Sequence, residues 1–179
     1  MAFRINFYGG PGVGKSTLAA RVYAELNRAG AVSVELVQEF IKVWAYEGKQ
    51  LDTFDQVYIF GQQLWAEHCR FKAGVEVIIT DAPVLLQCVY MHRLNPTVSV
   101  NLQEVALEYE KAYPALNFLV LRSVPYRREG RYQDEPELQE LDDSIKGFMD
   151  LWRLPYVIVT PNESEIILQI VKETAYKGA

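Results

Sequence analysis

The chain has 179 residues, half of them apolar and 23% charged, and its formal net charge is -5. This is the composition of a globular protein and excludes the disordered classes, while the length predicts a single domain over residues 1–179. The negative charge removes the bulk attraction toward nucleic acid, so any polyanion would need a local basic patch.

Three further features bear on the cellular compartment. Cys69 and Cys88 lie in separate stretches that are both predicted as helical, which suits a reduced cytoplasmic protein better than a disulfide framework. The first residues enter an apolar strand at once, without the pattern of a secretory leader. No apolar run approaches the roughly 20 residues of a transmembrane helix. A cytoplasmic protein without a membrane span is therefore predicted.

The apolar pattern alternates between short strands and longer helices. Strands are predicted at residues 5–8, 32–37, 75–80, 116–121 and 156–159. Helices are predicted at residues 15–28, 40–46, 53–71, 84–92 and 102–112, with two more beginning near 134 and 162. Residues 53–56 have the pattern of a capping box that opens the third helix. Five strands separated by helices predict an α/β fold, a doubly wound five-stranded sheet that is mostly parallel.

The most specific motif lies between the first strand and the first helix. Residues 9–16 read Gly-Gly-Pro-Gly-Val-Gly-Lys-Ser, which is the spacing of a phosphate-binding loop. Glycines let the backbone turn tightly and point N–H groups inward, and the helix N-terminus adds partial positive charge. Lys15 would reach the β- and γ-phosphates of ATP, and the Ser16 hydroxyl would ligate Mg²⁺. The predicted nucleotide-binding residues are Gly10, Gly12, Val13, Gly14, Lys15, Ser16 and Thr17.

Other classes of phosphate-loop protein lack their marks in this sequence. The Asn/Thr-Lys-x-Asp tetrapeptide of guanine-specific switches does not occur, and the strand at 75–80 ends in one acid, Asp81, where motor ATPases usually carry two. The sequence resembles the nucleoside and nucleotide kinase group of P-loop proteins. It is most similar to small kinase-like proteins of bacteriophages, and more distantly to nicotinamide riboside kinase domains. The resemblance is carried by residues 9–17, 38–40, 80–83 and 130–135, in that order.

Two carboxylates are predicted beside the phosphates. Glu39 and Asp81 lie just past the ends of the second and third strands, and ligands of open α/β sheets bind outside those ends. One acid would orient or deprotonate the acceptor hydroxyl, and the other would hold Mg²⁺. The resemblance to deoxynucleoside kinases implies that Glu39 is the base, and Asp81 takes the metal position. The reverse assignment is also chemically reasonable.

An arginine-rich segment follows the fourth strand. Residues 122–133 contain four arginines against one acid, whereas residues 134–143 contain six acids and no base. Nucleotide-type kinases place a mobile lid at this point, so a small lid is predicted at about 122–134. Its arginines would stabilise charge on the transferring phosphoryl group. Arg131 is the first candidate, followed by Arg127 and then Arg128. The alternative is an exposed basic loop that pairs with the acids.

The acceptor is expected between the second and third strands. That stretch is rich in aromatic residues, which can stack on a base, and in glutamines, which can hydrogen-bond to one. Gln62 and Gln63 are adjacent and must face different ways, so at most one reaches a ligand. About half of these aromatics are expected to be core. The predicted acceptor-binding residues are Glu39, Trp44, Tyr58 and Gln62.

The sequence thus predicts a kinase that uses ATP and Mg²⁺ to phosphorylate a nucleoside-like acceptor. Free nucleoside and nucleotide are two choices. A third is hydroxymethyluracil in DNA, because some phage kinases that this chain resembles phosphorylate that base. The net charge does not favour DNA, although a flipped base needs only stacking and a few phosphate contacts. A phage origin would place the protein in the host cytoplasm. The alternative function is a regulatory ATPase that acts with a protein partner.

Overall fold

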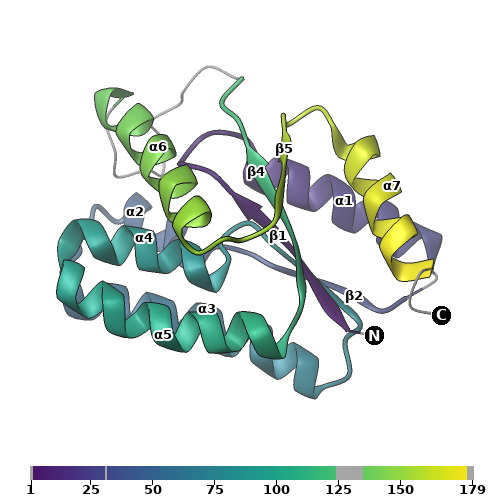
Figure 1. Ribbon diagram of the computed structural model, residues 1–179, viewed down its shortest axis with the longest axis horizontal. Helices are drawn as coiled ribbons and strands as arrows, with labels where there is room; N and C mark the ends of the chain where they lie inside the picture. The colour runs from purple at the N-terminus through teal and green to yellow at the C-terminus, as the bar shows by residue number, and fades with distance from the viewer. Residues whose placement is uncertain (1, 31, 124–134, 177–179) are drawn as a thin grey trace.

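The computed structural model describes residues 2–30, 32–123 and 135–176 (Figure 1). Within them, five strands form one sheet in the order β2-β3-β1-β4-β5. Every ladder between neighbouring strands is parallel. The predicted five-stranded α/β sheet is confirmed, and the described strands are all parallel rather than mostly so. The strands are β1 (Phe3–Tyr8), β2 (Val34–Val37), β3 (Val77–Thr80), β4 (Ala115–Val120) and β5 (Tyr156–Val159).

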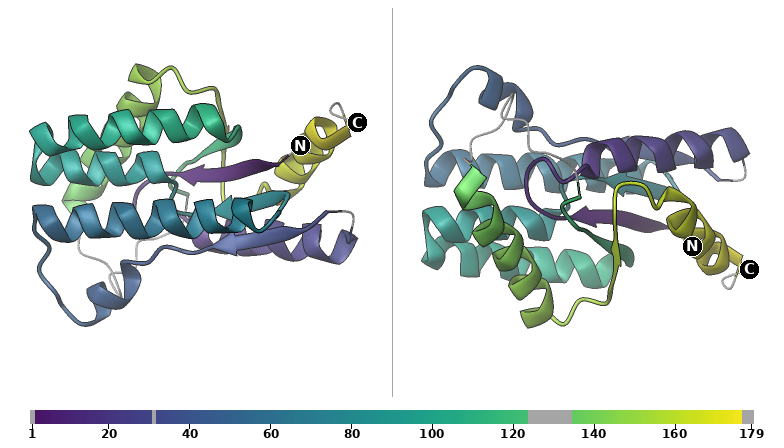
Figure 2. Two further views of the ribbon diagram at one scale, coloured as in Figure 1. Left: turned by 90° about the horizontal axis from the view of Figure 1, so that it is seen from below. Right: turned by 90° about the horizontal axis from the view of Figure 1, so that it is seen from above.

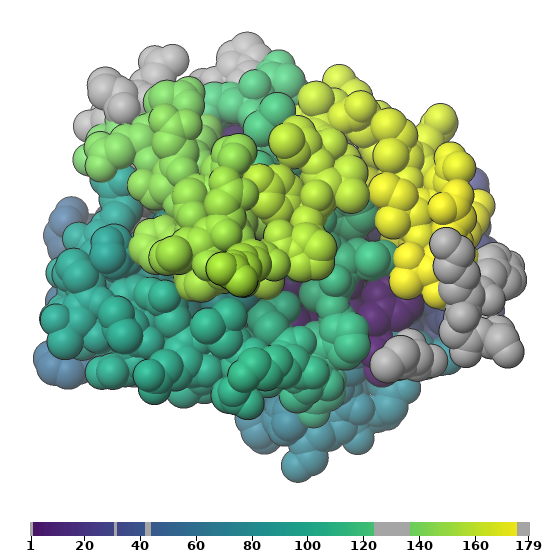
Figure 3. Space-filling view, viewed as in Figure 1, coloured from purple at the N-terminus to yellow at the C-terminus, as the bar shows by residue number. Residues whose placement is uncertain are grey.

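Helices cover both faces of this sheet, as a doubly wound fold requires (Figure 2). The helices α1 and α7 pack against each other on one face, whereas α3, α4, α5 and α6 cover the other face. In the space-filling view, α6 and α7 form the upper part of the visible surface, with α5 below them (Figure 3). The helices are α1 (Lys15–Ala29), α2 (Lys42–Tyr46), α3 (Thr53–Lys72), α4 (Val84–Leu94), α5 (Pro96–Ala112), α6 (Glu135–Leu151) and α7 (Ser164–Tyr176).

Alternation along β1 divides the interior into two cores. Ile5 and Phe7 point to the face covered by α1 and α7, where Leu18 and Ile167 are fully buried. Tyr8 points to the opposite face and packs with α4 and its neighbours. Successive side chains of a strand point to opposite faces, so one central strand serves both cores. The strand that carries the phosphate loop is therefore buried on both sides.

A buried ion network crosses the second core below the phosphate loop. Arg4 of β1 is fully buried, and its guanidinium contacts Glu67 of α3 at 3.3 Å and Glu110 of α5 at 2.8 Å. The Tyr113 carbonyl accepts a further hydrogen bond from Arg4 at 2.8 Å. Burial raises the pKa of Glu67 to about 7, while Arg4 and Gln63 pull it down. Ion pairs with Arg4 thereby connect α3 and α5 to β1.

One N-cap and one helix start differ from the sequence prediction. The capping box of α3 is formed by Asp52 and Asp55, one residue earlier than the predicted 53–56. The fifth helix begins at Pro96 instead of 102, because the Asn95 side chain accepts the Val98 N–H and Pro96 takes the first turn. Both starts use the short acceptor side chains that favour N-caps. No helix in the described part of the chain is long and apolar enough to cross a membrane.

Candidate active site

The phosphate loop connects β1 to α1 through three glycines with positive φ. The φ angles of Gly9, Gly12 and Gly14 are 136°, 78° and 102°, which other L-residues rarely adopt. Gly14 is the N-cap of α1, and no side chain caps the helix there. The first N–H groups of a helix lack partners inside it, and the helix dipole favours an anion at this end. The loop therefore forms an anion site at the start of α1.

Lys15 lies at the centre of this site. Its ammonium is largely buried and donates to the carbonyl oxygens of Gly9 at 2.6 Å and Gly10 at 2.8 Å. Burial lowers the pKa of Lys15, while the carboxylates of Glu39 and Asp81 raise it. The ammonium is held by two backbone dipoles and faced by two acids. It is placed to exchange these carbonyls for phosphate oxygens.

The two predicted acids come together beside the loop. Strand β3 pairs directly with β1, so Asp81, which follows β3, lies next to the strand that carries the phosphate loop. Asp81 is only 3% exposed, and its Oδ1 accepts the backbone N–H of Glu39 at 3.0 Å. This hydrogen bond fixes the chain where it leaves β2. Asp81 thus holds the backbone of Glu39 in place, and its carboxylate also offers an oxygen to a ligand of the phosphate loop.

The chemistry of the donors at this point suits Mg²⁺. Ser16 is exposed at the start of α1 and offers a hydroxyl, and Asp81 offers a carboxylate oxygen. Mg²⁺ is usually bound by one or two carboxylates together with phosphates and water, without an all-protein cage. Among the described residues, no group of three or more acids, histidines or cysteines gathers as a dedicated metal site. The residues present fit a metal that is held partly by nucleotide.

A pair of charged residues that was not singled out from the sequence contacts the phosphate loop. Arg122 follows β4, and Asp142 lies in α6. The Arg122 Nε donates to the Asp142 carboxylate at 3.0 Å, and that carboxylate accepts the Gly10 N–H at 2.9 Å. The Arg122 Nη1 donates to the Pro11 carbonyl at 3.0 Å. The change from arginines to acids along residues 122–143 indicated pairing only as the alternative interpretation, and it did not indicate that Arg122 and Asp142 are the partners.

Tyr90 of α4 is subject to the charges of Glu39 and Asp142. Burial raises the pKa of its phenol, and the nearby Glu39 and Asp142 carboxylates raise it further. The aromatic ring sits in an apolar helix sequence, so the pattern gave no reason to place it at the site. Its hydroxyl is a neutral polar group close to both acids.

The aromatic residues predicted around the acceptor gather in one cluster. Trp44 and Tyr58 are nearly parallel, with ring centroids 5.8 Å apart and planes at 11°. Phe40, which directly follows Glu39, lies edge-on to both rings. Lys49 covers Trp44, with its ammonium 3.5 Å from the ring centre. Since Trp44 and Tyr58 stack on each other, a flat acceptor would stack on the outer surface of the cluster or separate the two rings.

The adjacent glutamines separate as their spacing predicts. Gln63 is 2% exposed and donates to Thr80 and Glu67, so it belongs to the core. Gln62 is half-buried on another face of α3. Arg127, Arg128 and Arg131 lie outside the described residues, as does most of the predicted lid.

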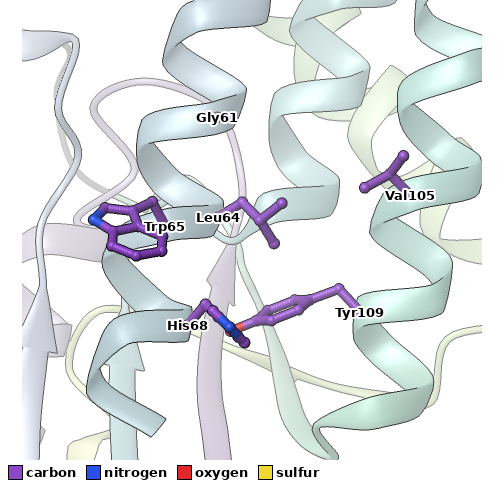
Figure 4. Close-up of a pocket in the computed structure, with 6 residues that line it drawn as sticks. All are labelled: Gly61, Leu64, Trp65, His68, Val105 and Tyr109. Carbon is purple, nitrogen blue, oxygen red and sulfur yellow. The ribbon is translucent and has the colours of Figure 1, made fainter. Parts of the chain in front are cut away.

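A shallow pocket of about 390 Å³ lies between α3 and α5 (Figure 4). Trp65 and Leu64 project from α3, and Tyr109 extends from α5 toward His68. The pocket contains none of the predicted site residues and belongs to the second half of α3. It does not provide the acceptor site, which is expected at the carboxyl ends of β2 and β3.

The sheet order, the phosphate loop and the acid after the neighbouring strand define a P-loop nucleotide-binding domain. The chain belongs to the AAA domain family, whose profile matches residues 4–165. No curated protein matches it. The fold is similar to the NadR protein crystallised with NAD and AMP-PNP, at a TM-score of 0.72 and 16% identity. It is also similar to NadR in complex with NR, at 0.69 and 14%.

These structural matches differ in length from the chain. The chain is covered for 99% in the first match and 90% in the second, but it spans only 50% and 46% of the NadR chains. At 16% and 14% identity, the structural similarity shows the fold alone.

Proposed function

We propose that this protein is an ATP-dependent, Mg²⁺-requiring kinase that phosphorylates a hydroxyl or phosphate of a small nucleoside-like acceptor. The observation that carries the proposal is the grouping of Lys15, Asp81 and Glu39. A buried ammonium in a phosphate loop faces two acids, and one acid fixes the backbone of the other. Phosphate binding alone needs only the loop. A second acid at the end of β2 provides a group for the acceptor.

The phosphate loop and Lys15 would bind the triphosphate. ATP binding would replace the carbonyl oxygens of Gly9 and Gly10 with phosphate oxygens as partners of the Lys15 ammonium. Mg²⁺, held by Ser16 and Asp81, would neutralise developing charge on the phosphates. The loop amides at the start of α1 supply fixed donors that need no reorganisation during transfer. NadR, which has the same fold, was crystallised with the ATP analogue AMP-PNP.

Glu39 is the proposed base, and Asp81 is the proposed metal ligand. The Asp81 Oδ1 accepts the Glu39 N–H, which leaves its second oxygen for Mg²⁺ or a water. The Glu39 backbone makes this contact, and the aromatic cluster begins at the next residue, Phe40, so the Glu39 carboxylate is proposed to lie between phosphate and acceptor. It would orient the acceptor hydroxyl and take its proton as the phosphoryl group transfers. The opposite assignment of the two acids remains the alternative.

The acceptor is proposed to stack on the aromatic cluster of Phe40, Trp44 and Tyr58, with Gln62 as a hydrogen-bonding partner. Phe40 and Tyr58 are exposed by 36% and 48%, so ring surface is available next to Glu39. NadR, of whose chain this protein spans 46%, was crystallised in complex with NR, which supports a small molecule as the acceptor. Hydroxymethyluracil in DNA is the other proposed acceptor. The lid arginines Arg127, Arg128 and Arg131 are proposed from sequence alone.

A regulatory ATPase is the second candidate function, and the AAA domain family assignment favours it. Such a protein would hydrolyse ATP in response to a protein partner and transfer no phosphoryl group to a small acceptor. A kinase releases ADP only when its acceptor is present, whereas such an ATPase releases ADP without one. Glu39 and Asp81 would then position a water instead of an acceptor hydroxyl.

Acceptor-dependent release of ADP tests the proposal. The protein is incubated with labelled ATP and Mg²⁺, and with pooled nucleosides, pooled nucleotides, plain DNA or hydroxymethyluracil DNA in separate reactions. A kinase releases ADP only with its acceptor and labels that acceptor. Release without any acceptor indicates the ATPase. The Lys15→Ala variant controls for contaminating enzymes, and equal activity in that variant refutes the phosphate-loop assignment.

A further inference from the structure

Two residues that the proposed reaction does not use contact the first half of the phosphate loop. Arg122 comes from the end of β4, and Asp142 comes from α6, twenty residues further along the chain. The Arg122 guanidinium contacts the Asp142 carboxylate through Nε at 3.0 Å and Nη2 at 2.9 Å. Each partner also contacts the loop: Asp142 accepts the Gly10 N–H and Arg122 donates to the Pro11 carbonyl.

The loop is shaped to receive this pair. A Cβ atom on Gly10 would overlap the Asp142 Oδ1 and come within 3.2 Å of the Arg122 Nη2. A side chain at position 10 would therefore displace the Asp142 carboxylate from the loop, although the φ of Gly10 is not positive, unlike the φ of Gly9, Gly12 and Gly14. The side chains of Arg122 and Asp142 are 23% and 20% exposed, so water screens their charges only partly.

The two charges oppose each other at the Lys15 ammonium. Asp142 raises the pKa of Lys15 and Arg122 lowers it. Without Arg122, the Asp142 carboxylate would repel a bound triphosphate, because like charges in a partly buried site interact more strongly than in water. Arg122 offsets that repulsion while Asp142 supplies the acceptor that Gly10 needs.

We infer that Arg122 and Asp142 are positioning residues for nucleotide binding, forming a charge-neutral pair that fixes the Gly10–Pro11 half of the phosphate loop. Asp142 sets the loop backbone, and Arg122 cancels its charge and holds Pro11. The inference rests on the proposed function only for the identity of the nucleotide. It makes a specific prediction: removing Arg122 harms ATP binding more than removing both charges does.

The test measures binding of a fluorescent ATP analogue with Mg²⁺ to the wild type, Arg122→Ala, Asp142→Asn and the double variant. Asparagine retains an oxygen for the Gly10 N–H but carries no charge. Arg122→Ala should weaken binding about tenfold, because a carboxylate is left uncompensated beside the phosphates. Asp142→Asn should bind as well as the wild type or better. The double variant should bind within about threefold of the wild type.

The outcome separates three roles for the pair. If the double variant binds as weakly as Arg122→Ala, Arg122 binds phosphate itself and the inference is wrong. If no variant changes binding, the pair is only structural and the inference is also wrong. Asp143→Asn is the matched control, since the neighbouring Asp143 is exposed and accepts a hydrogen bond from Gln139 instead.

Turnover provides a second readout that a merely structural role would not move. The uncompensated Asp142 carboxylate in Arg122→Ala should raise the KM for ATP more than it lowers kcat, and adding Asp142→Asn should reverse most of the KM effect. Equal changes in kcat across all three variants, without a KM change, contradict the inference. Failure of the wild type to phosphorylate any acceptor would refute the proposed function, whereas the binding measurements would still decide the role of the pair.

Discussion

Replacing Glu67 with glutamine should change how the stability of the protein depends on pH. Glu67 is fully buried between Arg4 and Gln63, and burial raises its pKa to about 7 from an ordinary value of 4.5. Between these two values the folded chain binds more protons than the unfolded chain. The stability of the wild type should therefore fall as the pH rises through this window, with the full loss present above pH 7.

The magnitude follows from the difference between the two pKa values. At roughly 1.4 kcal/mol for each unit of pKa, the loss amounts to about 3.5 kcal/mol at most. Glutamine resembles the protonated acid and cannot ionise. The free energy of unfolding of Glu67→Gln should match that of the wild type near pH 4 to 5. It should exceed it by about 2–3 kcal/mol near pH 8.

Urea unfolding followed by tryptophan fluorescence between pH 4.5 and 8 measures this difference. Glu108→Gln is the control, because Glu108 is exposed and pairs with Lys111 on the same helix. Its difference from the wild type should stay below about 1 kcal/mol and vary little with pH. A Glu67→Gln difference that is independent of pH would show that Glu67 ionises normally and that the reasoning from burial is wrong.

Further substitutions test the site and the helices. Glu39→Gln should lower the transfer rate at saturating Mg²⁺ by roughly 10²–10⁴-fold, whereas Asp81→Asn should raise the Mg²⁺ concentration needed, and the reverse pattern exchanges their roles. Gly14→Ala should abolish ATP binding and destabilise the fold by about 2 kcal/mol or more, since its φ is 102° and a Cβ would lie 2.7 Å from Pro161; near-normal ATP titration would contradict this. Gly61→Ala should stabilise the protein by up to about 1 kcal/mol in thermal unfolding, because its Cβ meets open space within α3, and a loss of stability would argue against that geometry.

The phosphate loop and the sheet were predictable because their signals are local. A strand, a glycine-rich turn and Lys15 follow one another within residues 3–15, and β-branched runs mark buried parallel strands. The meeting of Glu39 with Asp81 also followed, since both come after strands whose ends share an edge of the sheet.

Contacts between distant segments had no such signal. The pairing of Arg122 with Asp142 depends on how α6 crosses the end of β4, and the alternative interpretation of the sequence, that arginines pair with the acids after them, did not identify the partners. The stacking of Trp44 on Tyr58 depends on where the short α2 returns toward α3. Aromatic spacing along α3 could not separate this cluster from Trp65, which belongs to the pocket beside α5.

The central strands β1 and β3, which carry the phosphate loop and Asp81, should be locally more stable than the segment that carries the aromatic cluster. The phosphate loop and Asp81 grow from central strands whose residues are almost fully buried. The aromatic cluster instead draws on the five-residue α2 and on the chain that leaves the edge strand β2. Short, exposed segments open locally at low free energy, whereas central strands open only when the whole domain unfolds. Amide hydrogens of β1 and β3 should thus exchange with solvent last, and those around α2 first. Substitutions on the acceptor side should therefore change the stability of the nucleotide side little.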